Sequence, residues 1–102
     1  MGVTLWRNNS GAAFNRDGRP VRFGLGNDSR LLNASMKSAD LIGISCNGRF
    51  VALEIKKPGW RYAGTDREKA QQNFLDFVRR NFGIAGFVTC VEDMEQLFMG
   101  RI

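Results

Sequence analysis

Two acidic residues and one lysine stand where they could share a site. Glu54 and Lys56 lie two residues apart at the end of the apolar run 50–53, and Asp40 heads a second apolar run, 41–44. Successive side chains of a strand alternate between its faces, so Glu54 and Lys56 share one face of an extended segment. Two carboxylates can hold a hard divalent cation, and an ammonium group can stabilise an anionic transition state. The spacing therefore predicts metal-assisted hydrolysis of a phosphodiester.

The absence of histidine narrows the chemistry open to the chain. None of the 102 residues is His, which excludes histidine zinc sites, Ser-His triads and histidine general bases. The two cysteines, Cys46 and Cys90, lie in apolar, strand-like runs and not at paired ligand spacing, so we expect reduced thiols in the core rather than a disulfide. Catalysis is therefore left to carboxylates, lysine and a hard metal ion.

Length and composition predict a single folded domain, 1–102. Hydrophobic residues make up 43% of the chain, which argues against disorder. No apolar run approaches the roughly 20 residues of a membrane span. Residues 1–6 lack a basic head followed by an apolar signal core, so we expect an intracellular, cytoplasmic protein, in the host cytoplasm if it is viral. A net charge of +5, carried mainly by Arg, favours a nucleic-acid partner, although a solvated basic surface would have the same charge.

Turn signals and hydrophobic periodicity predict the secondary structure. The Asp-Gly and Asn-Gly pairs favour hairpin turns, Thr65 and Glu68 match a capping box, and apolar residues at 74, 77, 78 and 82 recur at helical spacing. This order of elements predicts an α/β fold with a mixed sheet. We expect a strand at 5–7, strands at 11–14 and 20–25 around Asp17-Gly18, a long loop at 26–39, strands at 40–46 and 50–56 around Asn47-Gly48, a helix from Thr65 to a stop at Gly83, a buried parallel strand at 84–89, and a last helix ending before Gly100.

Three parts of the sequence carry a resemblance to a known family. They are Ser38–Ile44, Gly48–Gly59, and Gln71 together with the block 83–86. As an ordered set they resemble the VRR-NUC domain, the virus-type replication-repair branch of the PD-(D/E)xK nuclease superfamily, over nearly the whole chain from Trp6 onward. The chain has the size of the small stand-alone members that are common in bacteriophages. The resemblance implies a restriction-endonuclease-like mixed central sheet flanked by helices.

The resemblance also implies roles for individual residues. Asp40 and Glu54 match the family's metal ligands, and the backbone carbonyl of Ile55 would complete a site for Mg²⁺ or Mn²⁺. Lys56 matches the catalytic lysine. Gln71 matches the glutamine of the following helix and fits the spacing to the 83–86 block better than its neighbour Gln72 does.

One ligand of many family members has no clear match. We expect the sequence, as it starts here, to lack the upstream helix that carries an additional acid, so that either water replaces that acid or Asp28 in the long loop supplies it. Trp60 and Tyr62 could stack on an unpaired base or pack on the edge of the sheet. Candidates for contacts with DNA phosphates, each with a solvated surface base as the alternative, are Arg7, Arg22, Lys37, Lys57, Arg61, Arg67 and Lys69.

These features predict a hydrolase, namely a metal-dependent endodeoxyribonuclease acting on branched or structured DNA. Nothing resembles a recognition helix that reads bases, which favours selectivity for structure over sequence. A homodimer resembling a Holliday-junction resolvase would offer two sites for two strands. Leu31, Leu32 and Met36 in the long loop would serve as its interface or else cap the chain's own core. The alternatives are a non-catalytic DNA-binding module that keeps the nuclease fold, and a nuclease acting on RNA or on flap or linear DNA.

Overall fold

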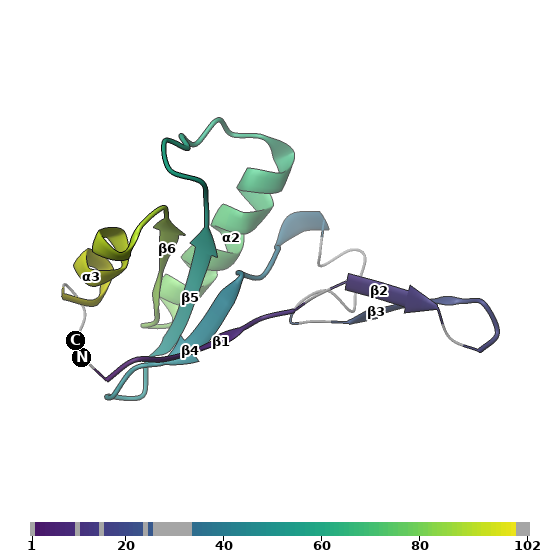
Figure 1. Ribbon diagram of the computed structural model, residues 1–102, viewed down its shortest axis with the longest axis horizontal. Coiled ribbons are helices and arrows are strands. Elements are labelled where there is room, and N and C mark those ends of the chain that lie inside the picture. The colour runs from purple at the N-terminus through teal and green to yellow at the C-terminus, as the bar shows by residue number, and fades with distance from the viewer. Residues whose placement is uncertain (1, 10, 15, 24, 26–33, 100–102) are drawn as a thin grey trace.

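A four-stranded mixed sheet organises the part of the chain that the computed structural model describes, residues 2–9, 11–14, 16–23, 25 and 34–99 (Figure 1). Its strand order is β1-β4-β5-β6, in which β4 is antiparallel to both β1 and β5, and β6 is parallel to β5. The predicted α/β class with a mixed sheet is confirmed. The strands are β1 (Thr4–Arg7), β4 (Leu41–Ile44), β5 (Phe50–Ile55) and β6 (Ile84–Val88).

Helices cover both faces of this sheet. α2 (Asp66–Arg80) and α3 (Val91–Met99) follow β5 and β6 respectively. Alternate residues of one strand point to opposite faces, so Ala52 packs with the α2 side chains while Val51 and Leu53 pack with Phe98 of α3. The predicted capping box is confirmed, because the Thr65 side chain accepts from the backbone N–H of Glu68 and the Glu68 carboxylate accepts from the backbone N–H of Thr65.

A second, two-stranded sheet projects from the body (Figure 1). It is the predicted hairpin of β2 (Gly11–Phe14) and β3 (Pro20–Phe23), and Gly18 in its turn has a φ of 76°, which suits a residue without a side chain. The projection gives the molecule a longest dimension of 48 Å against 31 and 24 Å in the other directions.

The hairpin of β4 and β5 is confirmed, but its turn is wider than predicted. A two-residue turn at Asn47-Gly48 needs a positive φ at both residues, whereas only Gly48 has one, at 83°. The N–H of Gly48 donates to the carbonyl of Ser45 at 2.9 Å, so Cys46 and Asn47 form the centre of the turn. The Ser45 hydroxyl donates to the Asn47 side chain and accepts from the N–H of Arg49 at 3.0 Å, which explains the additional residue.

Two expectations about apolar residues are wrong. Cys46 and Cys90 are free thiols, as expected, but both are exposed, because one lies in the turn and the other immediately before α3. The helical repeat does not extend to Phe82, which is 80% exposed and has a φ of 67°, because α2 ends at Arg80. Phe77 is 45% exposed, so the buried stripe of α2 is narrower than the periodicity indicates.

The predicted long loop is described only from residue 34. Asp28, Leu31 and Leu32 lie outside the described residues, and Met36 packs against the core cluster on the α2 side of the sheet. For Met36, the alternative that the loop caps its own core is therefore the one observed. No helix among the described residues is long and apolar enough to cross a membrane.

Candidate active site

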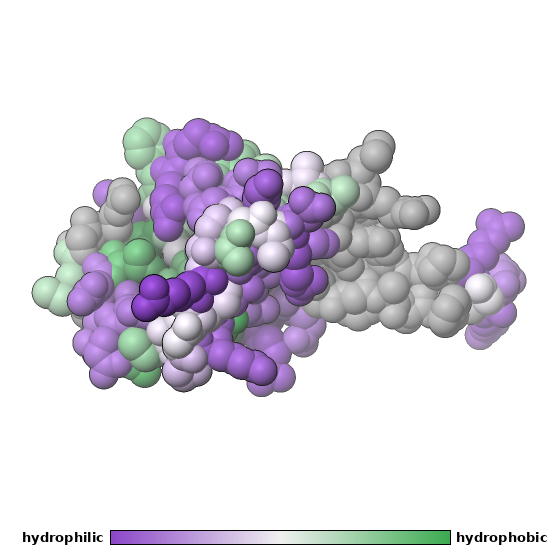
Figure 2. Space-filling model, turned by 90° about the horizontal axis from the view of Figure 1, so that it is seen from above, coloured by the Kyte–Doolittle hydropathy of each residue, from purple (hydrophilic) through white to green (hydrophobic). Residues whose placement is uncertain are grey.

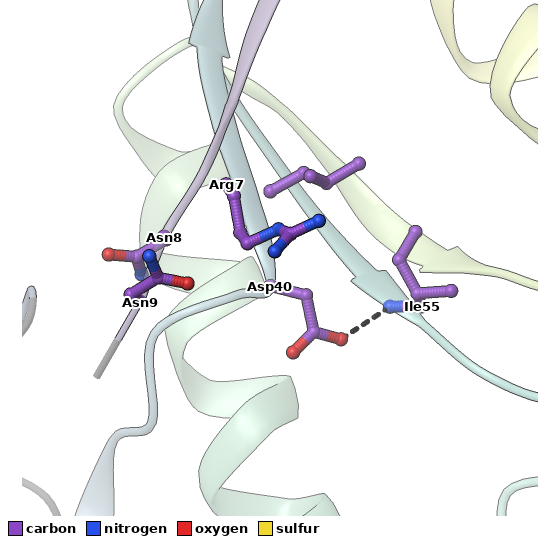
Figure 3. Close-up of a pocket in the computed structure, with 6 residues that line it drawn as sticks. Arg7, Asn8, Asn9, Asp40 and Ile55 are labelled. Atoms are coloured by element: carbon purple, nitrogen blue, oxygen red, sulfur yellow. Dashed lines mark hydrogen bonds between the residues drawn. The ribbon is translucent and has the colours of Figure 1, made fainter. Parts of the chain in front are cut away.

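Asp40 and Glu54 converge at one end of the β4–β5 hairpin. Leu41 pairs with Leu53, so Asp40, one residue before β4, lies beside the end of β5. The N–H of Ile55 donates to Oδ2 of Asp40 at 2.9 Å (Figure 3). Because the N–H and C=O of a strand residue point to the same side, the Ile55 carbonyl also lies on the side of Asp40. The structure therefore brings the two carboxylates and this carbonyl together.

Asn8 holds the segment that leads to Asp40. Its backbone N–H donates to the Asp40 carbonyl at 2.8 Å, and its side-chain amide donates to the Ala39 carbonyl at 2.8 Å and to the Ser38 hydroxyl at 3.0 Å. β1 thus anchors Asp40 from outside the hairpin. Asn8 was not among the residues predicted from the sequence, because a lone amide after a short edge strand gives no signal that could identify it.

Gln71 links Glu54 to Lys56. Its side-chain N–H donates to Oε1 of Glu54 at 3.0 Å, and its Oε1 accepts from Nζ of Lys56 at 2.9 Å. Glu54 is 5% and Gln71 is 3% exposed, so both polar groups are buried with partners. The neighbouring Gln72 donates instead to Asp76. The choice of Gln71 over Gln72 therefore agrees with the contacts.

Lys56 stays in line with β5 although the strand ends at Ile55. Its backbone N–H donates to the Val88 carbonyl at 2.8 Å, which continues the pairing with β6 by one residue. The alternation of strand side chains is thus preserved, and Lys56 lies on the same face as Glu54, the face covered by α2. An acid, an amide and an ammonium group form one hydrogen-bonded row.

The carboxyl of Glu54 holds its proton unusually tightly. Its pKa is raised from 4.5 to about 8, chiefly by burial and also by the hydrogen bond and the negative charge of Asp40, while the positive charges of Lys56 and Arg67 oppose the shift. Ionisation of a buried carboxyl beside a second carboxylate is unfavourable unless a cation compensates the charge. A divalent ion between them would remove this conflict by displacing the proton.

The donor set fits a hard divalent cation. Asp40, Glu54 and the Ile55 carbonyl offer oxygen atoms, and Mg²⁺ retains several waters and needs only one or two protein carboxylates in addition to substrate phosphate. No cluster of three or more His, Cys, Asp or Glu residues suited to a metal occurs within the described ranges. The candidate third acid, Asp28, lies outside them.

A pocket of about 440 Å³ opens beside Asp40 (Figure 3). Besides Asp40 it is lined by Arg7, Asn8, Asn9, Leu41 and Ile55. The exposed guanidinium of Arg7 next to Asp40 could neutralise a phosphate oxygen that approaches the carboxylate. Figure 2 views the molecule from the end toward which β5 points, and this face is largely hydrophilic.

The other basic residues predicted to contact phosphates lie on several different elements. The charge of Arg67 acts on Glu54, which places it near the site. Lys57, Arg61 and Lys69 are exposed on the connection after β5 and on the first turn of α2, and Lys37 is half-buried. Arg22 lies on β3, within the projecting hairpin. The structure thus places Arg7 beside Asp40 and Arg67 near Glu54, and all seven phosphate contacts stay predictions.

The raised pKa of Glu54 predicts a stability that depends on pH when divalent cations are absent. In the unfolded chain the carboxyl titrates near 4.5, and in the folded protein near 8, so between these values the folded state binds the additional proton. The free energy of unfolding should therefore fall as the pH rises from about 5 to about 8. Glu54→Gln cannot titrate and should show a smaller fall. Urea unfolding in chelator at both ends of this range measures the effect, and identical falls in the two proteins would contradict it.

Comparisons with family models, with curated proteins and with solved structures found no match. The resemblance to VRR-NUC nucleases therefore stays a prediction. The chemistry assigned to the site rests on how Asp40, Glu54, Lys56 and Gln71 are arranged.

Proposed function

We propose that this protein is a metal-dependent endodeoxyribonuclease that hydrolyses phosphodiester bonds in branched or otherwise structured DNA. The observation that carries the proposal is the hydrogen-bonded row of Glu54, Gln71 and Lys56, with Asp40 beside it. A structural ion pair does not need a buried carboxyl beside a second carboxylate. Two such carboxylates on neighbouring strands can hold a hard cation, which supports hydrolysis at a metal. The mixed sheet with helices on both faces is compatible with a restriction-endonuclease-like fold.

Each residue of the site would have a distinct task. Asp40, Glu54 and the Ile55 carbonyl would hold Mg²⁺ or Mn²⁺, which when bound lowers the pKa of a coordinated water and neutralises the phosphate. The Nζ of Lys56 would stabilise the negative charge that develops on the phosphoryl oxygens. Gln71 fixes the orientation of both Glu54 and Lys56, so that neither side chain must be ordered when substrate binds.

Structured DNA is favoured over a plain duplex by the shape of the molecule. The β2–β3 hairpin projects away from the sheet that carries the site (Figure 1), and the residues of its turn, 16–19, are exposed and include two Arg. A site on the body and a basic arm at a distance can contact two segments of DNA at once. Phosphate contacts of this kind position a substrate without reading its sequence.

One assay tests the proposal directly. Labelled four-way junction, flap, splayed-arm and linear duplex are incubated with Mg²⁺, with Mn²⁺, or with chelator. We expect cleavage of branched substrates ahead of linear duplex, and only with a divalent cation. Paired symmetric cuts in the junction would support a homodimer, and single cuts would favour a monomer. DNA binding without any cleavage would instead support the second candidate, a non-catalytic DNA-binding module. Faster cleavage of RNA with the same structure would mean that the substrate of the nuclease is RNA.

Binding should weaken steeply with salt. If about seven basic residues contact phosphates, the logarithm of the association constant should fall against the logarithm of salt concentration with a slope of about −6. Fluorescence anisotropy with a labelled junction in chelator measures this slope. A slope near zero would mean that the basic residues form only a solvated surface.

A further inference from the structure

A second pocket lies at the outer edge of β6, across Lys56 from Asp40. Strand β6 is the last in the sheet, and the pocket of about 550 Å³ extends from it to α3. Sites for small molecules have volumes of about 300–1,000 Å³. The lining residues are Trp60, Phe87, Thr89, Asp93, Gln96 and Leu97.

An aromatic wall joins this pocket to the candidate active site. The ring centroids of Trp60 and Phe87 are 4.8 Å apart, so Trp60 packs at the edge of the sheet, which is one of the two alternatives left open for it, while stacking on an unpaired base stays a prediction. Nζ of Lys56 lies 5.4 Å from the Trp60 centroid and 5.7 Å from the Phe87 centroid. Phe87 of β6 also lies directly opposite Glu54 of β5 in the parallel strand pair. A ligand against this wall would therefore be one side chain away from the proposed catalytic lysine.

The position of Trp60 is fixed before any ligand binds. Its indole N–H donates to Oε2 of Glu68 at 2.9 Å. Hydrogen bonds from Thr65, first from its backbone N–H, hold the pKa of the Glu68 carboxyl below its ordinary value, so this partner is charged. The ring is thus attached to the buried side chain of Glu68 in the first turn of α2, which lowers the entropic cost of stacking against the ring.

The remaining side chains determine which kind of ligand fits. The carboxylate of Asp93 accepts from the backbone N–H and the hydroxyl of Thr89, both at 2.9 Å, and these bonds keep its pKa low. A negative charge in the pocket repels phosphate and attracts hydrogen-bond donors. Gln96, which is exposed on α3, offers an amide that can both donate and accept. A flat, neutral ring with an amino group could stack on the two aromatic rings and form hydrogen bonds with both Asp93 and Gln96.

We propose that this pocket binds an unpaired nucleobase of the DNA substrate, stacked on the wall of Trp60 and Phe87 with its amino-bearing edge toward Asp93 and Gln96. Base-to-aromatic stacking and carboxylate contacts to amino groups are established modes of recognition. The inference rests on the proposed function, because the base belongs to a nucleotide next to the phosphate held at Asp40 and Glu54. Flaps, splayed ends and open junctions offer unpaired bases and a closed duplex does not, so the pocket would supply selectivity for structure.

The chain offers a direct optical test. It has two tryptophans, so Trp6→Phe leaves Trp60 as the sole tryptophan reporter. This protein is titrated in chelator with a single-stranded adenine hexanucleotide and with the same strand made of abasic sites, which carries equal charge. We expect the adenine strand to quench Trp60 emission and to bind about tenfold more tightly than the abasic strand. Equal affinity and equal emission changes for the two strands would overturn the proposal.

A pair of glutamine variants separates the pocket from a general effect on folding. Gln96→Ala removes an exposed amide of the pocket and should reduce the preference for the adenine strand, whereas Gln72→Ala, the same change outside the pocket, should leave it intact. Equal loss in both variants would overturn the assignment. The cleavage assay separates the two proposals: cleavage without base-dependent quenching refutes only the pocket, and quenching without cleavage in Mn²⁺ refutes only the nuclease.

Discussion

Replacing Asp40 with Asn should abolish cleavage dependent on a divalent cation while DNA affinity in chelator stays nearly unchanged. Asn keeps a side-chain oxygen that can accept from the N–H of Ile55, so the local fold should survive, but the substitution removes one of the two carboxylates proposed to hold the metal. Affinity for DNA should come mainly from basic residues elsewhere. We expect the single-turnover rate to fall by at least about a thousandfold, since metal and electrostatic stabilisation contribute several kcal/mol.

The same substitution at an unrelated acid provides the control. Asp66 is exposed on the first turn of α2, and Asp66→Asn should cleave at the wild-type rate. Glu54→Gln should resemble Asp40→Asn, because both carboxylates belong to the proposed site. If either site variant retained the wild-type rate, the metal assignment would be wrong.

The second large effect is expected at Lys56. Lys56→Met keeps most of the aliphatic stem near Trp60 and Phe87 but removes the ammonium group. We expect the rate to fall by about a hundred- to a thousandfold, which is typical when one electrostatic donor to a transition state is removed. Calorimetric titration should show that Mn²⁺ still binds.

Lys57→Met is the matched control. Lys57 is the next residue, is exposed, and lies outside the row formed with Gln71. The single-turnover rate of Lys57→Met at saturating DNA should therefore be close to that of the wild type, even if a phosphate contact of Lys57 is lost. Loss of Mn²⁺ binding together with activity in Lys56→Met would mean that Lys56 organises the site and does not act on the phosphate.

The elements that the sequence predicts well are those with local causes. The capping box places both of its partners within four residues, and the hairpin of β4 and β5 needs only two apolar runs and a turn. The parallel pairing of β6 follows from the helix that precedes it. Asp40, Glu54 and Lys56 meet for the same reason, since register along one hairpin decides their separation.

Features that depend on distant contacts were not predictable in this way. Asn8 reaches Ala39 across 31 positions, and nothing near Asn8 in the sequence indicates this contact. The raised pKa of Glu54 depends on burial under α2, and the exposure of Cys90 and Phe82 depends on where the helices begin and end. Tertiary context overrides local pattern at each of these positions.

The position of Gln71 on α2 implies that the hairpin of β4 and β5 forms before the complete site during folding. Hairpins form within about 1–10 μs from local contacts, so Asp40 and Glu54 can meet early. Gln71 joins them from 17 residues beyond Glu54 and requires the crossover through α2 to dock, a slower step because the contact is less local. During refolding, strand signals should therefore recover before the proposed cleavage activity. Local detachment of α2 would separate Lys56 from Glu54 while leaving the hairpin paired, so we expect the proposed activity to be the first property that a partly unfolded chain loses.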